Sequence, residues 1–375
     1  MAGIYIHIPF CRKACHYCNF HFSTQTQYIE PFTNALLEEL AIQKDYLKNP
    51  IETIYFGGGT PSIMSQQNIE RIMGQISKHY NLADSFECTL EANPDDINLE
   101  KLSAWKSIGI NRLSLGIQSF QANALEWMNR AHSVEQSHQA IQLAYRAGIM
   151  NLSVDLIYGT PHLTDKELIS DLDTIKSYGI PHVSCYALTV EEKTALHKMI
   201  QLKKIENIDT THQSNHFNII VENLQEQGMD HYEISNFAKP GHRSKHNSNY
   251  WKGIPYLGLG PSAHSFNTDT RQWNIANNQL YIQSISNGIV PFEIERLPIA
   301  TQFNEYMMIS LRCMEGFSTQ TILDRFGINF LNHSLLIAAN FETKGQLIKT
   351  ATGFTLTKEA KFFADGIASD FFWID

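Results

Sequence analysis

Three cysteines near the start of the chain are the residues best suited to chemistry. Cys11, Cys15 and Cys18 follow the spacing C-x₃-C-x₂-C. Thiolates are soft ligands that suit iron–sulfur clusters and zinc. A four-iron cluster ordinarily takes four thiolates, so three would leave one iron open to a small molecule. We therefore predict a 4Fe-4S cluster on this loop. A zinc site with His7 or His16 as the fourth ligand, or three reduced cysteines that only pack, are the alternatives.

Further polar residues and glycines follow short apolar runs. Gly57-Gly58-Gly59-Thr60-Pro61 comes after one such run, and glycines there let the backbone approach a ligand closely. Carboxylates can accept hydrogen bonds from hydroxyl and ammonium groups, and an arginine can pair with a carboxylate. Each residue alone also fits an ordinary solvated or paired polar group. The other candidates of this kind are Glu91, Gln118, Arg130 and Asp155.

An alternation of strands and helices must position these residues. Apolar periodicity predicts helices around 32–40, over 66–79, 99–108 and 134–147. A further helix is predicted to begin after an N-cap at Thr164, with Glu167 in a capping box, and to run to about Tyr178. Six βα units imply an α/β fold with a parallel sheet, curved into a partial (β/α)₆ TIM-like barrel whose catalytic face lies at the carboxyl ends of the strands. The predicted strands are Gly3–Ile8, Glu52–Phe56, Ser85–Glu91, Arg112–Ile117, Asn151–Ile157 and His182–Leu188.

The pattern changes after the sixth strand. We expect a barrel core over 1–190, an extension over 191–280 that includes a helix at His212–Gln227, and a smaller C-terminal domain over 281–375. The last domain reads as mostly helical, with a short hairpin at Thr350–Thr357 that suggests a winged-helix-like form.

Composition narrows the class of protein. The chain has 375 residues, 43% of them hydrophobic, and a net charge of −9, which disfavours a non-specific nucleic-acid binder. No apolar run is long enough for a membrane span, and no signal peptide is apparent at the N-terminus. We expect a cytoplasmic protein, and Cys88, Cys185 and Cys313 read as free thiols.

The cysteine spacing resembles that of the radical S-adenosylmethionine (SAM) enzymes. In that superfamily the open iron binds SAM, and an electron from the cluster splits SAM into a 5′-deoxyadenosyl radical. The resemblance implies a 4Fe-4S cluster, SAM and an electron donor for this chain.

A closer resemblance is to the oxygen-independent coproporphyrinogen III oxidase family. It rests on Tyr-x-His-Ile-Pro-Phe-Cys-x₃-Cys-x-Tyr-Cys, Phe-Gly-Gly-Gly-Thr-Pro, Glu91, Gly-x-Gln-Ser-Phe and Asp-Leu-Ile-Tyr-Gly, over about residues 3–190. The SAM-binding positions that this resemblance implies are Tyr5, Tyr17, Gly58, Gly59, Thr60, Glu91, Gln118, Arg130, Asp155 and Ala187.

One departure from the oxidases changes the expected function. They carry a fourth cysteine two residues after the third, where this chain has Phe20. In this it is similar to the HemW-type haem chaperones, which bind and deliver haem. The run from His246 through Tyr250 to Trp251 also matches their H-N-x-x-Y-W motif. An imidazole can bind haem iron and aromatic rings can cover a porphyrin, although a packed loop is the simpler interpretation of these residues alone.

Three interpretations of the function therefore remain. The first is a haem chaperone that binds a cluster, SAM and haem, with a haem-accepting protein as partner. The second is an oxidase that decarboxylates coproporphyrinogen III by radical chemistry. A zinc-binding module on a barrel scaffold is a third interpretation. His264, which follows Gly258 and Gly260, is either a SAM or substrate contact or a histidine satisfied within the fold.

Overall fold

The core of the molecule is a curved sheet of parallel strands. The computed structural model describes residues 1–374. Its six successive strands pair in chain order, each parallel to the next. Their outward-facing residues, such as Ile4, Ile6 and Val154, are almost fully buried because helices cover the outer face. The strands are β1 (Ala2–Ile8), β2 (Ile51–Gly58), β3 (Leu82–Ala92), β4 (Arg112–Gln118), β5 (Leu152–Tyr158) and β6 (His182–Ala187).

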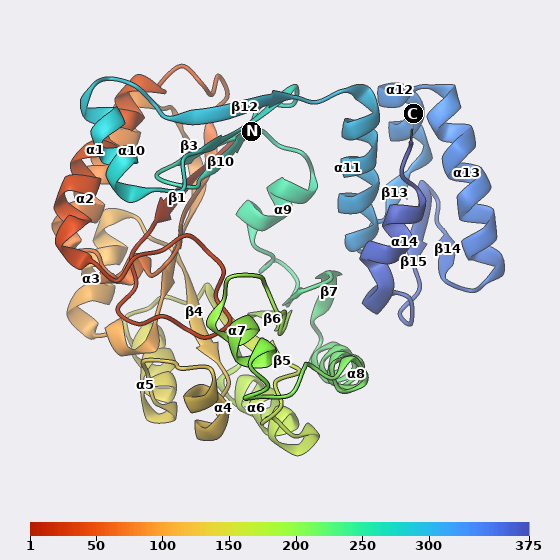
Figure 1. The fold of residues 1–375 in the computed structure, drawn as a ribbon, viewed down its shortest axis with the longest axis horizontal. Coiled ribbons are helices and arrows are strands. Elements are labelled where there is room, and N and C mark those ends of the chain that lie inside the picture. The colour runs from red at the N-terminus through yellow and green to blue at the C-terminus, as the bar shows by residue number, and fades with distance from the viewer. Residues whose placement is uncertain (375) are drawn as a thin grey trace.

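Helices connect the strands and line the outside of the curve (Figure 1). The predicted helices at 66–79 and 99–108 are confirmed at those bounds, and Thr164 with Glu167 forms the predicted capping box of α6. The helices are α1 (Ile29–Ile42), α2 (Gln66–His79), α3 (Leu99–Ile108), α4 (Ala122–Trp127), α5 (Val134–Arg146), α6 (Asp165–Tyr178), α7 (Ala195–Gln201) and α8 (Thr210–Glu226), with 3₁₀ turns at Thr26–Tyr28, Pro61–Ile63 and Pro94–Asp96.

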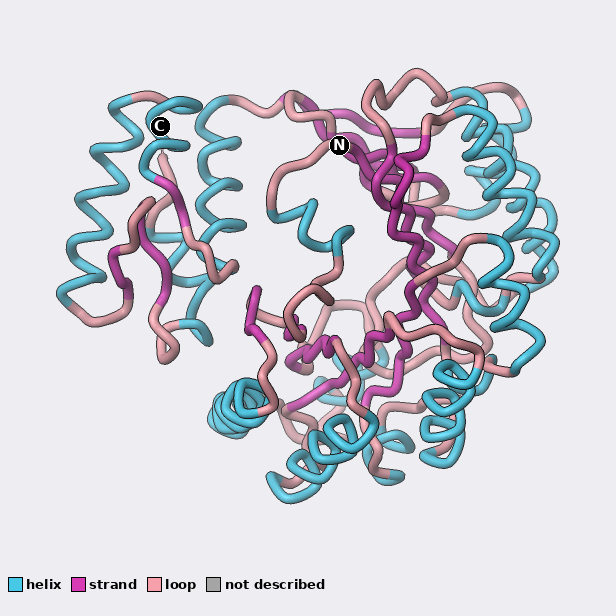
Figure 2. The backbone as a smooth tube through the Cα atoms, turned by 180° about the vertical axis from the view of Figure 1, so that it is seen from behind, coloured by secondary structure: helices cyan, strands magenta, loops and turns pink. Residues whose placement is uncertain are grey.

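Later segments extend the sheet on both sides to twelve strands. β9 (Tyr256–Leu259) lies parallel to β1, and the antiparallel strands β10 (His264–Phe266), β11 (Thr270–Asn274) and β12 (Phe292–Arg296) continue from it. At the other side β8 (Asn236–Ala238) pairs with β6 and with β7 (Asp230–Glu233). Figure 2 shows the resulting open curve from behind. The predicted partial barrel is therefore confirmed, although the sheet is wider than six strands.

The segment after 281 packs on the barrel rather than on the C-terminal helices. In α10 (Asn278–Ser286), Tyr281 is fully buried, and its hydroxyl donates to Glu39 Oε2 at 2.5 Å. β12 then completes the main sheet. We therefore propose a boundary near Leu297, later than the position 281 expected from the sequence.

The C-terminal unit has its own apolar core around Phe303, Phe317 and Phe371. Its three-stranded sheet has the order β13-β15-β14, and the hairpin begins at Leu347, before the expected Thr350. The elements are α11 (Ile299–Arg312), β13 (Phe317–Ser318), α12 (Thr319–Phe326), α13 (Ile328–Thr343), β14 (Leu347–Lys349), β15 (Gly353–Leu356), a 3₁₀ turn at Lys361–Phe363 and α14 (Ala364–Asp370).

This unit docks beside β7 and α8. The Ile234 N–H donates to the Arg312 carbonyl at 3.0 Å, and the Met314 N–H donates to the Tyr232 carbonyl at 3.1 Å. The ring of Phe362 lies 5.5 Å from that of Phe217 on α8. Within the described residues, no helix combines the length and apolarity that crossing a bilayer requires.

Candidate functional site

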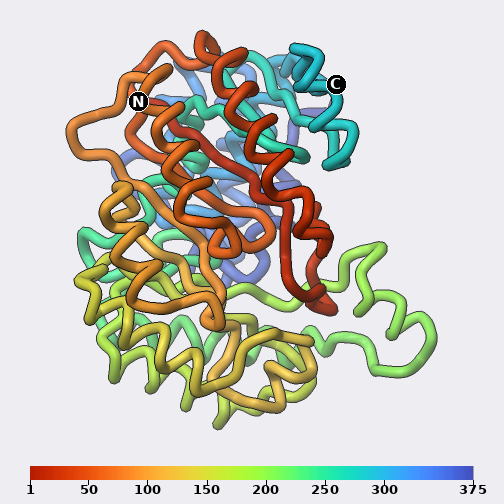
Figure 3. The backbone as a smooth tube through the Cα atoms, turned by 90° about the vertical axis from the view of Figure 1, so that its left-hand side faces the viewer, coloured from red at the N-terminus to blue at the C-terminus, as the bar shows by residue number. Residues whose placement is uncertain are grey.

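The cysteine loop leaves the carboxyl end of β1 and borders a cavity of about 660 Å³. Cys11, Cys15 and Cys18 are half-buried free thiols that all line this cavity. The Cys11 N–H donates to the Ser23 carbonyl at 3.0 Å, which closes the loop at its base. Figure 3 shows the segment that carries α7 beside this loop, where the Leu196 N–H donates to the His16 carbonyl at 2.8 Å.

Two donors point at the cysteine sulfurs. Thr60 Oγ1 lies 3.5 Å from Cys11 Sγ, and Arg130 Nη1 lies 3.3 Å from Cys15 Sγ. Burial raises the pKa of Cys11 to about 11 and also raises that of Cys18. Metal coordination would offset this cost because it stabilises the thiolate. Three thiols with preset donors to sulfur fit an iron–sulfur cluster.

The zinc alternative fits this loop less well. A tetrahedral zinc site with Zn–S bonds of about 2.3 Å brings its sulfurs to roughly 4 Å from one another. Among the described residues, the cysteines and His7 or His16 form no group of three with ligand atoms that close. Both ring nitrogens of His7 are also engaged, by Tyr5 at 3.2 Å and by the His21 carbonyl at 2.8 Å.

The glycine turn after β2 lies directly against the cysteine loop. The Gly59 N–H donates to the Ile8 carbonyl and the Thr60 N–H to the Phe10 carbonyl, each at 2.8 Å. A Cβ at Gly59 would lie 2.6 Å from the Phe10 oxygen and 3.0 Å from Cys11 Sγ. Gly58 has φ of 105°, which favours glycine. The glycines therefore allow the close contact that fixes the loop.

Two buried carboxyl groups face the cavity from β3 and β5. Glu91 Oε1 accepts from the Tyr55 hydroxyl at 2.7 Å, and burial raises the pKa of Glu91 to about 8. Asp155 Oδ1 accepts from Ser114 Oγ at 3.1 Å, and burial raises its pKa to about 6. Each carboxylate is thus held in place by a hydroxyl donor and would be stabilised further by a cationic ligand group.

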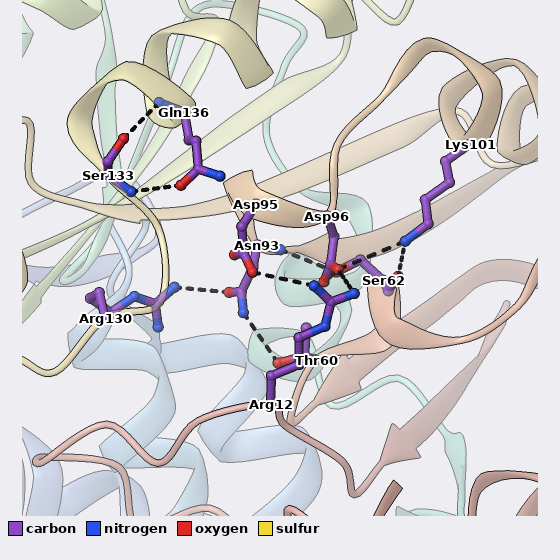
Figure 4. A network of polar contacts seen from close by, with 10 residues as sticks. All are labelled: Arg12, Thr60, Ser62, Asn93, Asp95, Asp96, Lys101, Arg130, Ser133 and Gln136. Atoms are coloured by element: carbon purple, nitrogen blue, oxygen red, sulfur yellow. Dashed lines mark hydrogen bonds and ion pairs between the residues drawn. The ribbon is translucent and has the colours of Figure 1, made fainter.

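Arg130 belongs to a network that joins the cysteine loop to the ends of three strands (Figure 4). Its Nη2 donates to Asn93 Oδ1 and to the Gly116 carbonyl, each at 2.8 Å. Asn93 Nδ2 in turn donates to Thr60 Oγ1 at 3.4 Å. On the other side of Asn93, Arg12 pairs with Asp96 at 2.5 Å. This network holds the donors to the sulfurs in a fixed geometry.

The structure brings most of the sequence-predicted SAM residues together. Gln118, at φ 70°, ends β4 beside Asp155, and Ala187 ends β6. Tyr5 is the exception, because it does not line the cavity and instead stacks on Tyr55 beneath it. The predicted SAM residues that do line the cavity are Tyr17, Gly58, Gly59, Thr60, Glu91, Gln118, Arg130, Asp155 and Ala187.

The three predicted haem residues lie elsewhere, on or at the end of the short helix α9 (Lys245–Trp251). Only 2% of His246 is exposed, and both its ring nitrogens are engaged, Nδ1 with Thr53 Oγ1 at 2.8 Å and Nε2 with the Tyr250 hydroxyl at 2.9 Å. Trp251 lies under the guanidinium of Arg312, 5.8 Å away. In this conformation none of the three lines the cavity.

Two other histidine positions need a separate account. His264 is exposed, stacks on Trp273 and does not line the cavity.

Asp165, His212 and His216 cluster on α6 and α8. However, His216 Nδ1 accepts from the Gly159 N–H at 3.1 Å, so its proton sits on Nε2, which faces Asp165 Oδ1 at 3.2 Å. That tautomer has no lone pair for a metal, and the cluster braces the turn after β5.

Several supporting residues were not predicted from the sequence. Tyr55, Ser114, Asn93 and Arg12 orient the predicted residues, but none stands in a recognisable motif. Their one available signal was position, because Asn93 follows the end of β3 and Tyr55 lies two residues before Gly57, the first residue of the glycine turn.

Comparison with known proteins identifies the family. Residues 5–175 match the model of the radical SAM superfamily. The heme chaperone HemW of Bacillus subtilis is 32% identical over 99% of this chain and 99% of its own length. The heme chaperone HemW of Synechocystis is 30% identical over 96% of this chain and 86% of its own. The chain belongs to the HemW family of radical SAM proteins. Membership in this family implies a 4Fe-4S cluster and SAM, which agrees with the donor set of the cysteine loop.

The fold extends to a solved relative outside the HemW family. The coproporphyrinogen III oxidase HemN of Escherichia coli superposes with a TM-score of 0.85 at 20% identity, over 99% of this chain and 89% of its own. At that identity the likeness establishes the shared fold, including the C-terminal unit, and leaves the chemistry to the residues of the site.

Proposed function

We propose that this protein is a haem chaperone that carries a 4Fe-4S cluster and SAM. The observation that supports this most strongly is the near full-length similarity to relatives named heme chaperone HemW. Phe20 supports it too, because it replaces the oxidases' additional cysteine and its side chain is 65% exposed beside the cavity. We further propose that the protein works in the cytoplasm with an electron donor and a haem-accepting protein.

The residues at the cavity have separate roles in this proposal. Cys11, Cys15 and Cys18 hold the cluster, which supplies an open iron and an electron when bound. Glu91 and Asp155 accept hydrogen bonds from the SAM ammonium and ribose, and the glycine turn lies against the SAM amino group. Arg130 donates to Cys15 Sγ and adds positive charge beside the cluster.

For haem we propose His246 as the iron ligand, with Tyr250 and Trp251 against the porphyrin. Since both imidazole nitrogens are now engaged within the fold, binding requires α9 to leave its present position. The imidazole is in the neutral form that binds iron, because burial lowers its pKa to about 3.

The alternative function is oxygen-independent coproporphyrinogen III oxidation. It is favoured by one observation, which is that nine of the ten predicted SAM residues line one cavity. A radical SAM enzyme needs that set, whereas simple haem transfer does not.

One anaerobic experiment separates the two functions. The cluster is reconstituted and reduced, and SAM is added with either coproporphyrinogen III or haem. The chaperone proposal expects stoichiometric haem binding by absorbance and no protoporphyrinogen by chromatography. Two decarboxylations per coproporphyrinogen molecule would refute it and establish the oxidase.

A further inference from the structure

Helix α9 lies between the strands of the barrel and the C-terminal unit (Figure 1), and its His246 is almost fully buried. Besides its two ring contacts, the His246 backbone N–H donates to Glu87 Oε1 at 3.2 Å. A Cβ built on Gly3 of β1 would lie 3.4 Å from the imidazole. The ring therefore fills the barrel interior between β1 and β2, and in this position it cannot reach an external ligand.

The ring of Tyr55 lies between this histidine and Glu91, which lines the cavity. The imidazole stacks on Tyr55 with ring centroids 5.0 Å apart and planes 27° apart. The hydroxyl of that same Tyr55 donates to Glu91 at 2.7 Å. Tyr5 stacks on both rings, at 6.1 Å from Tyr55 and 6.4 Å from His246. Removing the imidazole would leave Tyr55, and with it Glu91, without support on one side.

Glycines on both sides of α9 would allow the helix to change its position. Gly241 and Gly253 flank the helix at φ 83° and φ 63°, and a Cβ on either would meet nothing within 4 Å. The helix has only seven residues, and two of them hold buried donors, Asn249 Nδ2 and Trp251 Nε1, that have no hydrogen-bond partner among the described residues. Buried donors without partners weaken the seated position.

We propose that α9 has two positions, through which haem and SAM oppose each other's binding. In the seated position His246 and Tyr55 hold Glu91 for SAM. In the released position His246 binds haem iron and the support of Glu91 is lost. The inference rests on the proposed function, because it takes His246 as the haem ligand and Glu91 as a SAM contact. A ligand shifts such an equilibrium only through its different affinity for the two states.

The test is a reciprocal titration of the protein with its reconstituted cluster under anaerobic conditions. The haem dissociation constant is measured by difference absorbance with and without saturating SAM. The SAM dissociation constant is measured by equilibrium dialysis with and without haem. We expect SAM to weaken haem binding roughly 10-fold, and haem to weaken SAM binding by the same factor. Equal haem affinities with and without SAM would overturn the coupling.

Three variants test whether the coupling between haem and SAM binding passes through the contact of His246 with Tyr55. Tyr55→Phe keeps the stacked ring but removes the donor to Glu91, so haem binding should persist while the effect of SAM on it falls toward one-fold. A coupling factor unchanged in Tyr55→Phe would overturn the route through Tyr55. His246→Ala should lose haem binding, whereas His162→Ala, at an exposed histidine, should keep both haem binding and coupling.

The same measurements separate the two levels of the proposal. Haem binding that needs His246 but ignores SAM would refute only the coupling. Haem binding that is identical in wild type and His246→Ala, or absent from the wild type, would refute the proposed haem site and the coupling with it.

Discussion

Glu91 is a residue whose ionisation differs between the folded and the unfolded chain. Burial raises its pKa to about 8 from 4.5, and the hydrogen bond from Tyr55 offsets only part of this effect. Between these two values the folded protein retains a proton that the unfolded chain has released. The stabilisation from this group is therefore fully present below about pH 4.5 and is lost as the pH rises through about 8.

We expect Glu91→Gln to flatten the pH dependence of stability in the cluster-free protein. Thermal melting of wild type should fall more steeply between pH 5 and pH 8.5 than melting of the variant, because the glutamine side chain does not titrate. Glu100→Gln, at an exposed position on α3, should follow wild type. Parallel curves for Glu91→Gln and wild type would contradict the raised pKa.

The cluster assignment is tested at Cys15, whose sulfur accepts from Arg130. Cys15→Ala removes one of three thiolates, so we expect iron and sulfide after reconstitution to fall to a small fraction of wild type, with loss of the brown colour. Cys313→Ala, a half-buried thiol in the C-terminal unit, is the matched control and should retain the cluster. Iron and sulfide retained by Cys15→Ala would exclude the assignment.

For individual residues, the sequence indicated which charged side chains face the cavity but not which neighbouring residues bind them. Glu91 and Asp155 were predicted from their places in the carboxyl-terminal parts of strands. Tyr55 and Ser114, which bind them, could not be predicted, because their contacts depend on how neighbouring strands are aligned. His246 was predicted as a ligand from a motif, and the motif gave no sign that Thr53 and Tyr250 occupy both its nitrogens.

Among the elements, α6 has a well-defined start. The Thr164 N–H donates to Glu167 Oε2 at 2.8 Å, and the Glu167 N–H donates to Thr164 Oγ1 at 3.3 Å. Thr164→Ala should lower the free energy of unfolding by about 1 kcal/mol, since a backbone donor loses its partner. Denaturant unfolding followed by circular dichroism measures this change. Thr164→Ser keeps the cap and should lie close to wild type, and a Thr164→Ala midpoint equal to wild type would show that the cap contributes nothing.

Elements with strong local signals were predicted well, and those fixed by distant pairing were not. α2 and α3 have apolar periodicity and capping residues, Ser65 and Asn98, within the same short stretch. β9 has no such signal, because it becomes a strand by pairing with β1, about 250 residues earlier. The boundary that we propose near Leu297, later than the expected 281, has a related reason, since Tyr281 is apolar enough for either core and its contacts with Phe32 and Glu39 place it on the barrel.

In the whole molecule, the C-terminal unit forms one wall of the cavity through Arg312, Phe362 and Asp365. Phe362 packs on Phe217, whereas its neighbour Phe363 is 57% exposed. Phe362→Ala should therefore weaken the docking by roughly 1–2 kcal/mol, which corresponds to about a 5–30-fold larger equilibrium constant for opening.

Hydrogen exchange at the Ile234 and Met314 amides measures this opening, because both amides donate across the junction of the two units. Phe363→Ala is the matched control and should exchange like wild type. Unchanged exchange in Phe362→Ala would show that the ring contact does not hold the units together.

The place of β1 in the sheet also has a consequence for how the protein is made. Among the twelve strands of this sheet, β1 is the first to leave the ribosome, yet it lies between β2 and β9 rather than at an edge. The ribosome adds about 5–20 residues per second, so roughly 12–50 seconds pass between the synthesis of β1 and that of Tyr256–Leu259. During this interval one side of β1 presents unpaired backbone groups with apolar side chains beside them. We therefore expect the nascent barrel to be most prone to pairing with other chains before its last parallel strand emerges.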